Sequence, residues 1–383
     1  MQHSLFDPAF QSDSIPPFIQ TVMNHGAHLA CSVSGGKDSD AMLRFLAKLH
    51  WARRWRGDLF ALFCDLGRIE WAGVPEHLQQ LCSTFGLPLI KVWPNRPMID
   101  EWQHRYEVIT QKQQDKPFWS SASARYCTKH EKTQSSDKFL RRYDFVVCAI
   151  GIRAEESDSR AKKPRYQVRD DIASAWYKTP KQCKSAQEKE AWAEQAFQQW
   201  LDSGKKGRFA LSWHPIHHWS LEEVWAYNGT STADVARRAA LYQAGKIKQA
   251  FSGFPCHWVY ATGNTRLSCS LCVLASTDDI LNGAKHNPQT WAELALMELT
   301  SGWGFQQSRW LASLHQDVLS MSFAQRDRLH QVLHELGLLQ RWNTHFLVGL
   351  LSYCPLECLA CWSDEAFLGL ARAIACCWAE LSD

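Results

Sequence analysis

A glycine-containing hexamer near the start of the chain has the residue types of an anion-binding loop. Residues 34–39 read Ser-Gly-Gly-Lys-Asp-Ser and follow the mainly apolar run 28–33. Glycines let backbone N–H groups close on phosphate oxygens, and a helix that begins there adds its positive end. Lys37 adds a full positive charge, and Ser34 and Ser39 add hydroxyl groups. The hexamer does not fit the GxxxxGK[ST] phosphate loop, so we predict a different phosphate-binding turn.

Positively charged residues follow another predicted strand. Arg153 directly follows the apolar run 145–152, and Arg160 comes seven residues after Arg153. Guanidinium and ammonium groups stabilise the charge that builds up on a leaving pyrophosphate. Lys37, Arg153 and Arg160 are therefore candidate phosphate-binding residues. A surface ion pair is the alternative for each arginine alone.

Two carboxylates occupy corresponding positions. Asp38 lies in the hexamer, and Asp65 directly follows the apolar run 59–64. Mg²⁺ in nucleotide sites is usually held by one or two carboxylates together with phosphate oxygens. Asp38 and Asp65 are therefore candidates for orienting Mg²⁺.

Two cysteines form a C-x-x-C motif. Cys269 and Cys272 have the spacing that holds one metal ion or forms a redox pair. Cys127 and Cys256 would complete a four-cysteine set suited to a [4Fe–4S] cluster. His257 in place of one cysteine would suit Zn²⁺ instead. Free cysteines are also common as small buried apolar residues, so packing remains the alternative.

The elements that must position these residues alternate between strand and helix. Apolar runs predict strands at residues 28–33, 59–64, 87–92, 145–152 and 209–213, and helical spacing predicts helices at 41–49 and 74–85. Such alternation indicates a parallel sheet covered on both faces, with its carboxyl-end loops gathered at one edge. The predicted fold class is therefore α/β, a Rossmann-like parallel sheet with helices on both faces, followed by a helical C-terminal domain.

A basic stretch interrupts this pattern. Residues 160–184 carry eight Lys or Arg, with Trp176 and Tyr177 among them. Cations and aromatic rings together suit phosphate contact and base stacking, which makes DNA or another nucleic acid a candidate partner. A solvated, flexible insertion is an equally good interpretation of the charge run alone.

Composition excludes several classes of protein. The chain has 383 residues, 45% hydrophobic and 21% charged, which is a globular composition. A net charge of +3 excludes a wholly basic polymer binder but not a local basic groove. We find no apolar run of membrane-spanning length and no secretory signal, so we predict a cytoplasmic location. Fourteen cysteines without a signal indicate reduced thiols, a metal or cluster site, or sulfur chemistry.

We expect four segments. They are an N-terminal tail (1–26), a nucleotide-binding domain (27–230, with a basic insertion at about 160–207), a cysteine-bearing extension (231–285) and a helical C-terminal domain (286–383). In the last segment, Cys354, Cys358 and Cys361 repeat on one helix face, so we interpret them as packing residues.

The hexamer resembles the PP-loop, SGGxDS, of the N-type ATP pyrophosphatases, which have the adenine nucleotide alpha hydrolase-like fold. With Lys37 in fourth position, the chain resembles the phosphoadenosine phosphosulfate (PAPS) reductase family more specifically. Further resembling segments lie in order at residues 64–71, 125–132, 151–160 and 215–225. Segment 257–274 resembles the H-P-x-Y-x-x-G-x-x-R-x-S-C-x-x-C-x-L pattern of phage PAPS-reductase-like proteins, with Trp258 in place of Pro.

The resemblance implies roles for individual residues. The catalytic positions are Lys37, Asp38, Asp65, Arg153 and Arg160. The nucleotide-binding positions are Ser34, Gly35, Gly36, Lys37, Asp38, Ser39, Asp65, Gly151 and Glu156. The sulfurtransferase of Dnd-type DNA phosphorothioation systems belongs to this family and carries a four-cysteine iron–sulfur cluster. Cys127, Cys269 and Cys272 match its pattern, whereas Cys256 lies farther from the C-x-x-C motif than the remaining family cysteine.

The resulting functional hypothesis is an ATP pyrophosphatase that adenylates a substrate oxygen and supports sulfur transfer, with DNA phosphorothioate modification as one form. Its expected ligands are ATP and Mg²⁺. Its expected partners are a cysteine desulfurase and other subunits of a modification or phage-defence system. One alternative is a PAPS or adenosine phosphosulfate reductase, for which the sequence offers no clear nucleophilic cysteine. Another is a nucleotide-binding regulatory subunit without turnover.

Overall fold

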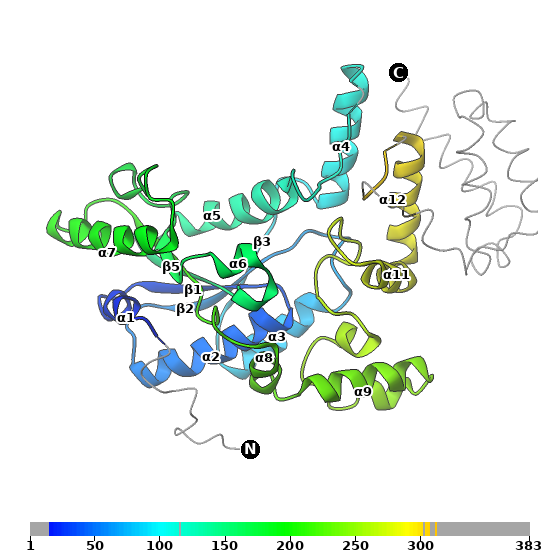
Figure 1. Ribbon diagram of the computed structural model, residues 1–383, viewed down its shortest axis with the longest axis horizontal. Coiled ribbons are helices and arrows are strands. Elements are labelled where there is room, and N and C mark those ends of the chain that lie inside the picture. The colour runs from blue at the N-terminus through cyan, green and yellow to red at the C-terminus, as the bar shows by residue number, and fades with distance from the viewer. Residues whose placement is uncertain (1–14, 115, 302, 307–310, 312–383) are drawn as a thin grey trace, which may run out of the picture. The chain divides into compact units, whose positions relative to one another are not determined.

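The computed structural model describes residues 15–114, 116–301, 303–306 and 311 (Figure 1). These residues divide into two compact units. The first consists of residues 15–98 and 125–270, and the second of residues 99–124 and those from 271 onward. The predicted C-terminal packing cysteines Cys354, Cys358 and Cys361 lie outside the described residues.

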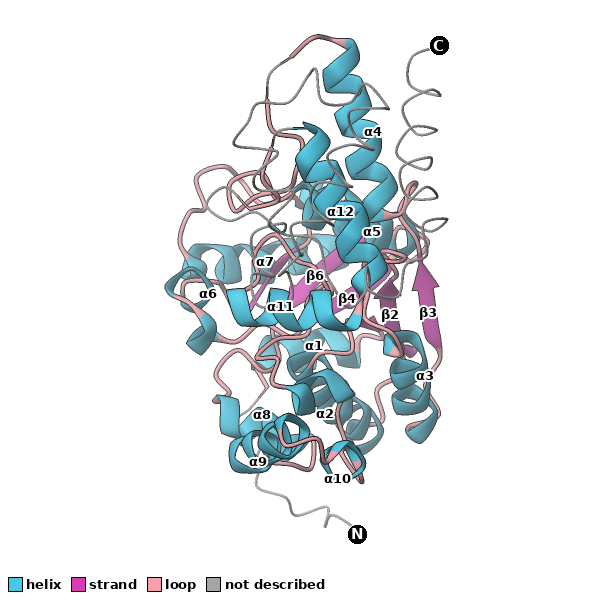
Figure 2. Ribbon diagram, turned by 90° about the vertical axis from the view of Figure 1, so that its right-hand side faces the viewer, coloured by secondary structure: helices cyan, strands magenta, loops and turns pink. Residues whose placement is uncertain are grey.

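The first unit is built on a six-stranded sheet with the order β3-β2-β1-β4-β6-β5. Its strands are β1 (His28–Val33), β2 (Leu59–Cys64), β3 (Leu89–Val92), β4 (Phe145–Ile150), β5 (Tyr166–Val168) and β6 (Phe209–Trp213). All neighbouring pairs are parallel except β5 with β6, which is antiparallel. In Figure 2, β3 lies at one edge of the sheet. The predicted Rossmann-like parallel sheet is therefore confirmed.

Helices cover both faces of this sheet. The helices of the first unit are α1 (Pro17–Asn24), α2 (Lys37–Arg53), α3 (Val74–Thr84), α5 (Gln134–Leu140), α6 (Asp158–Ala161), α7 (Ala186–Asp202), α8 (Leu221–Tyr227), α9 (Thr232–Gln243) and α10 (Ile247–Phe251). Short turns complete it: a π-helical turn (Cys127–Thr133) and three 3₁₀ turns (Ala154–Glu156, Ala175–Tyr177 and Trp258–Thr262). Figure 1 shows α2 and α3 on one side of the strands and α5 on the other.

Side-chain alternation along the strands builds two hydrophobic cores. Leu29 of β1 packs with α1, α2, α3 and α7, whereas Ala30 packs on the opposite face with Leu140 of α5. Successive residues of a strand point to opposite faces, so a strand covered on both sides is apolar throughout. This explains why β2 (LFALFC) is buried at every position.

Local sequence signals fix several helix ends. Ser220 and Glu223 form a capping box at the start of α8, with the Ser220 N–H donating to Glu223 at 2.6 Å and the Glu223 N–H donating to Ser220 Oγ at 3.2 Å. Asp38 and Asp40 lie in the first turn of α2 and Arg53 in its last, so each charge opposes the nearby end of the helix dipole.

The second unit is helical where it is described. Its helices are α4 (Met98–Gln111), α11 (Thr277–His286) and α12 (Pro288–Ser301). Trp119 donates its indole N–H to the carbonyl of Trp303 at 2.7 Å and packs against Phe305, with ring centroids 5.1 Å apart. No described helix is long and apolar enough to cross a membrane.

The five predicted strands are all present, but the structure divides the chain differently. Helix α1 lies in the segment predicted as a tail, yet Ile19 and Val22 are completely buried in the sheet core. Residues 231–270 pack with the sheet and form no separate extension, because Val259 and Tyr260 enter the same core. The basic insertion contains the edge strand β5. This strand has three residues, which is too few to show a strand pattern in the sequence.

Candidate functional site

The predicted phosphate loop connects β1 to α2. Gly35 has a φ of +73°, a left-handed conformation that favours glycine. Ser39 Oγ donates to the Gly36 carbonyl at 2.8 Å and accepts the Ser34 N–H at 3.2 Å. The Ser39 side chain thus ties the two ends of the loop together, so residues 34–39 form a closed turn at the carboxyl end of β1.

The lysine of this loop lies beneath the surface. Lys37 is 6% exposed, and its ammonium lies 5.8 Å from the ring centroid of Trp225 and 5.7 Å from that of Tyr260. The ammonium pairs with Asp38 at 3.2 Å and donates to the Thr265 carbonyl at 3.4 Å. Aromatic faces and a carboxylate both stabilise a partly desolvated cation. The positive charge is therefore held at a defined place in the loop.

Two side chains from distant segments hold the backbone of the same residue. The Lys37 N–H donates to the hydroxyl oxygen of Tyr260 at 2.8 Å. The Asn228 amide donates to the Lys37 carbonyl at 2.8 Å. Tyr260 is 1% exposed, and this burial raises the pKa of its hydroxyl, so Tyr260 is a neutral phenol. Tyr260 and Asn228 were not predicted from sequence, although Tyr260 lies within a family-like segment.

Arg153 joins the loop from the end of β4. Its Nε donates to Asp38 Oδ1 at 2.5 Å, and an Nη donates to Glu155 at 2.5 Å. Burial alone would lower the pKa of Arg153, but Asp38, Glu155 and Glu156 outweigh it and raise that pKa. Asp38 therefore lies between two cations, and its two oxygens serve as counter-ions for Lys37 and Arg153.

Gly151 makes this close approach possible. A Cβ atom there would lie 3.2 Å from the Asp38 carbonyl carbon and oxygen and 3.2 Å from the Ser39 nitrogen. These are backbone atoms at the start of α2, which cannot move aside as a flexible side chain would. Glycine at residue 151 therefore lets the end of β4 pack directly on the phosphate loop.

A second ion-pair group lies beside the first. Glu156 pairs with Arg160 and, at 3.3 Å, with Arg266. Arg266 comes three residues before Cys269, so this contact ties the C-x-x-C segment to the turn after β4. Glu156 thus joins Arg160, a predicted site residue, to Arg266, which no prediction included.

The loop after β2 connects the remaining predicted residues. Asp65 Oδ1 accepts the Gly67 N–H at 2.8 Å, which shapes the turn. Glu70 pairs with Lys132 of the π-helical turn at 3.6 Å, and burial raises the pKa of Glu70. Ser270 donates to the Ile69 carbonyl from its N–H at 2.8 Å and from its hydroxyl at 2.9 Å. The segments that carry Cys127 and Cys269 are therefore both attached to the loop of residues 65–71.

The four predicted metal ligands are divided between the two units, with Cys127, Cys256 and Cys269 in the first. Among the described residues, no three His, Cys, Asp or Glu side chains gather as a metal site. Cys256 is 6% exposed in the sheet core, where burial first and Asp40 second raise the pKa of its thiol. Cys256 therefore lies among core side chains, and its role as a fourth ligand beside Cys127, Cys269 and Cys272 stays a prediction. Cys272 belongs to the second unit.

One further buried pair supports the loop. Asp40 is 1% exposed, and one carboxylate oxygen lies 2.6 Å from Nε2 of His77 on α3. The pair links the first turn of α2 to α3. Neither residue was predicted, because their partnership spans 37 positions of sequence.

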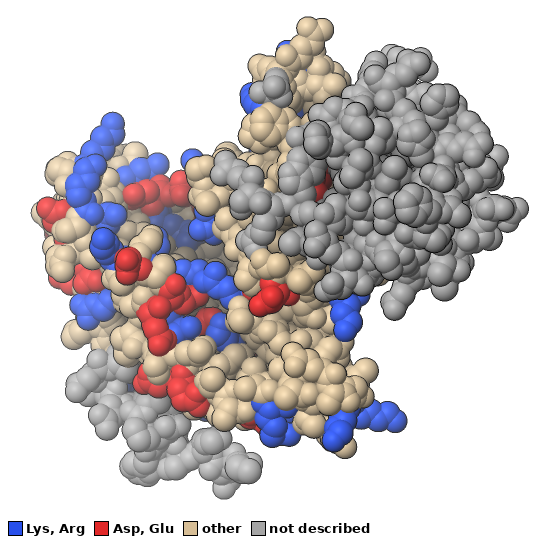
Figure 3. Space-filling view, turned by 45° about the vertical axis from the view of Figure 1, so that its right-hand side comes forward, with Lys and Arg blue, Asp and Glu red and all other residues tan. Residues whose placement is uncertain are grey.

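Basic and acidic side chains are mixed on the face shown in Figure 3, so no surface of a single charge covers the described part of that face. A glycine turn with buried cations after the first strand of a parallel sheet defines an α/β protein with a turn of the kind that binds anions. The chain belongs to the phosphoadenosine phosphosulfate reductase domain family, whose model matches residues 28–272.

Among the solved structures similar to this chain is the U34-tRNA thiolase from Methanococcus maripaludis with its [4Fe-4S] cluster. It is similar to this chain at 13% sequence identity and a TM-score of 0.31, covering 80% of this chain and 84% of the thiolase chain. A comparison with curated proteins found no match.

Proposed function

We propose that this chain is an ATP pyrophosphatase that adenylates a substrate oxygen and supports sulfur transfer to the adenylated position. The observation that carries the proposal is the loop of residues 34–39, with Lys37 and Arg153 held on either side of Asp38. Preorganised cations are effective where negative charge develops, because they need little reorganisation during the reaction. Family membership agrees with sulfur-related nucleotide chemistry.

The proposed reaction has two steps. First, a substrate oxygen attacks the α-phosphorus of ATP, forming a P–O bond while the bond to pyrophosphate breaks. Second, a hydrosulfide-class donor attacks the substrate atom that bears this oxygen, and AMP leaves with the oxygen. No net oxidation or reduction occurs when the donor is a hydrosulfide. A persulfide donor, as a cysteine desulfurase supplies, needs two electrons from a thiol reductant to release the sulfur.

The residues of the chain have distinct parts in the first step. The loop backbone binds phosphate oxygens at the start of α2, where N–H groups of the first turn are available. Lys37 and Arg153 stabilise the pyrophosphate charge, and Arg160 adds a third cation nearby. Asp65, whose second oxygen is not used by the Gly67 turn, is the better candidate for Mg²⁺, because both oxygens of Asp38 contact cations.

The proposal extends to the acceptor substrate and to the partner proteins. We propose a nucleic acid as the acceptor, with DNA phosphorothioate modification as the specific form, on the basis of the basic residues 160–184. A cysteine desulfurase and further subunits of a modification or phage-defence system would deliver sulfur and select the site.

An iron–sulfur cluster is a separate proposal, and no step above depends on it. It rests on the spacing of Cys269 and Cys272 and on the attachment of the Cys127 segment to the same loop. Anaerobic purification tests it through absorbance near about 400 nm. The cluster proposal requires this absorbance to be lost in Cys127→Ala and Cys269→Ala. A colourless protein with one equivalent of zinc would support the zinc alternative.

Pyrophosphate release separates the possible functions. The purified chain is incubated with ATP and Mg²⁺, with and without DNA, and pyrophosphate is measured. Release that requires nucleic acid supports the proposal. Sulfite formation from PAPS would instead support a sulfonucleotide reductase, and tight ATP binding without turnover would support a regulatory subunit.

A further inference from the structure

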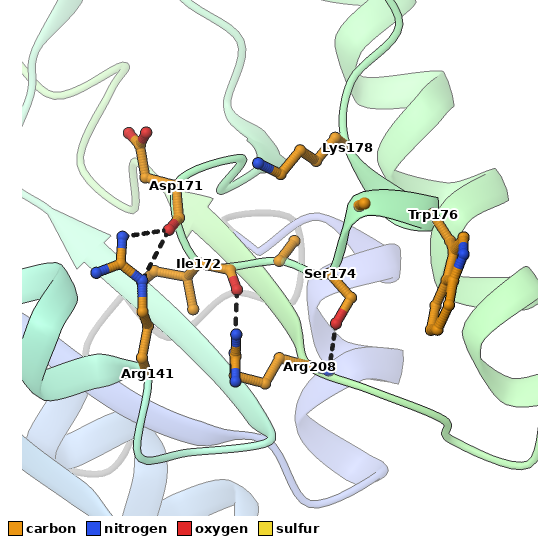
Figure 4. A pocket seen from close by; sticks show the side chains of 9 residues that line it. Arg141, Asp171, Ile172, Ser174, Trp176, Lys178 and Arg208 are labelled. Atoms are coloured by element: carbon orange, nitrogen blue, oxygen red, sulfur yellow. Dashed lines mark hydrogen bonds between the residues drawn. The ribbon is translucent and has the colours of Figure 1, made fainter.

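A cavity lies away from the loop of residues 34–39. It has a volume of about 520 Å³ and is open to solvent (Figure 4). Its polar and aromatic lining residues are Arg141, Asp171, Ser174, Trp176, Lys178 and Arg208. Most of them come from the stretch after β5, whose basic character was noted in the sequence. Three cations and one carboxylate therefore line a single cavity beside a tryptophan.

The cavity lies at the amino ends of the parallel strands, whereas the phosphate loop lies at their carboxyl ends. Arg208 directly precedes β6, and Arg141 comes four residues before β4, so both mark the amino ends of these strands. The phosphate loop follows the carboxyl end of β1, which is parallel to β4. A six-residue strand spans about 20 Å. A small ligand in the cavity therefore cannot reach the phosphate loop, whereas a polymer can reach both.

Backbone carbonyl groups orient the two arginines of this cavity. Arg141 donates from Nε and one Nη to the Asp171 carbonyl, at 3.1 and 2.7 Å, and Arg208 donates from Nε to the Ile172 carbonyl at 3.3 Å. Within the described residues, neither arginine forms an ion pair, and Lys178 is exposed without a hydrogen-bond partner. Each guanidinium keeps N–H groups for an anion.

Two hydrogen bonds between Ser174 and Arg208 hold the backbone close to Trp176. Ser174 N–H donates to the Arg208 carbonyl at 3.0 Å, and Arg208 N–H donates to Ser174 Oγ at 3.0 Å. Gly207 has a φ of +76°, and a Cβ atom there would lie 2.7 Å from Ser174 Oγ and 3.5 Å from the ring of Trp176. Trp176 is nevertheless 67% exposed. An exposed tryptophan ring offers a large, rigid face on which a planar group can stack.

Tyr177 does not share this role. It is 3% exposed, and its hydroxyl donates to the Lys206 carbonyl at 2.8 Å. The sequence-based expectation that both aromatic residues stack with bases is therefore correct at most for Trp176. Tyr177 instead attaches the residues after β5 to the loop that precedes β6.

We infer that this cavity binds single-stranded nucleic acid, with a base stacked on Trp176 and backbone phosphates against Arg141, Lys178 and Arg208. Base stacking on an exposed aromatic ring beside cations is the usual basis of single-strand binding. A duplex offers no free base face, and a mononucleotide leaves the phosphate loop out of reach. The inference rests on the proposed function, because it names the class of nucleic acid that would be the acceptor substrate.

Fluorescence anisotropy with a labelled twelve-nucleotide oligodeoxythymidine measures this binding in the full chain. Trp176→Ala is expected to weaken binding at least tenfold, because stacking supplies much of single-strand affinity. Lys178→Gln is expected to weaken binding and to reduce the slope of log affinity against log salt by about one. Trp51→Ala is the matched control, since Trp51 is 57% exposed on α2. It is expected to bind as the unaltered chain does.

Several outcomes would overturn the inference. These are unchanged binding by Trp176→Ala, equal weakening by Trp51→Ala, or equal affinity for a duplex of the same length. Trp176→Phe, which keeps a stacking ring, is expected to restore most of the affinity. ATP binding without oligonucleotide is expected to be unchanged in all these variants. If ATP turnover fails while Trp176-dependent binding persists, the proposed function fails and the binding site stands. If turnover with DNA persists in Trp176→Ala at unchanged affinity, the site fails and the function stands.

Discussion

The hydroxyl oxygen of Tyr260 accepts a hydrogen bond from the backbone N–H of Lys37 at 2.8 Å, across 223 positions of sequence. The contact joins the phosphate loop to the segment that leads into the C-x-x-C motif. Gly36 is part of the same contact, because a Cβ atom there would lie 3.4 Å from the Tyr260 oxygen and 3.6 Å from the Leu267 carbonyl oxygen. The loop of residues 34–39 and the segment that leads into the C-x-x-C motif are therefore in direct contact.

Tyr260→Phe tests this contact. The change leaves the Lys37 N–H without its partner in a buried place, so we expect a loss of about 1–3 kcal/mol in the free energy of unfolding. We also expect weaker ATP binding, because the loop backbone loses one of its two side-chain supports. Urea unfolding and ATP titration measure the two effects. Tyr143→Phe, on the other face of the sheet, is the control and should leave ATP affinity unchanged.

Lys37→Met separates the charge of Lys37 from its packing. Methionine fills the space against Trp225 and Tyr260, and Asp38 keeps its pairing with Arg153. We expect a folded protein whose pyrophosphate release is about 100-fold slower or worse, as for removal of one preorganised charge-stabilising group. Lys248→Met, at an exposed lysine of α10, serves as the control. Normal release by Lys37→Met would rule out the assignment of residues 34–39 as the phosphate site.

Gly151→Ala tests the approach of β4 to the loop. The added Cβ atom must displace Asp38, with which it would be in contact at 3.2 Å, so we expect ATP affinity to fall at least tenfold. The comparison is Gly245→Ala, which has open space around it but a φ of +75°. Its backbone strain should lower stability by about 1 kcal/mol and leave ATP affinity unchanged. The same loss of affinity in both variants would contradict a local effect at Asp38.

The stability of the protein should depend on pH through His214. Its Nδ1–H donates to the Pro164 carbonyl at 2.7 Å, and burial lowers the pKa of the ring to about 4 from 6.5. The unfolded chain binds a proton below about pH 6.5, whereas the folded chain does so only near pH 4. Stability is therefore expected to fall between these values as the pH falls, by up to about 3 kcal/mol.

Urea unfolding at a series of pH values measures this dependence. His214→Gln keeps a donor for the Pro164 carbonyl and removes one titration, so it should reduce the slope of the curve between pH 6.5 and 4. The remaining slope is expected from His257, because burial likewise lowers its pKa to about 4. The control is His25→Gln, at an exposed histidine of the same unit. An unchanged slope in His214→Gln would show that other groups cause the acid sensitivity.

Thiol labelling tests the place of Cys256. Its thiol is buried, and burial raises its pKa, so alkylation of the native chain should leave Cys256 unmodified while Cys183, which is partly exposed, reacts. Mass spectrometry identifies the modified residues. Rapid labelling of Cys256 at a rate equal to that of Cys183 would argue against its place in the core.

Much of the fold and part of the site could be predicted from sequence. The alternation of apolar runs predicts the parallel sheet, because strands buried on both faces must be apolar throughout, as β2 is. Glycines before a helix predict the phosphate loop, because only such a turn brings backbone N–H groups to a phosphate. Arg153 and Arg160 follow from the rule that carboxyl-end loops gather at one edge.

Only the tertiary structure decided which distant residues meet. Tyr260, Asn228 and Arg266 reach the loop through contacts that no local pattern encodes, since each depends on how whole segments pack. The same is true of Cys256, whose thiol could serve as a metal ligand and which only the tertiary structure places among core side chains. Sequence spacing reports which side chains share an element, whereas long-range packing decides their burial, their partners and hence their chemistry.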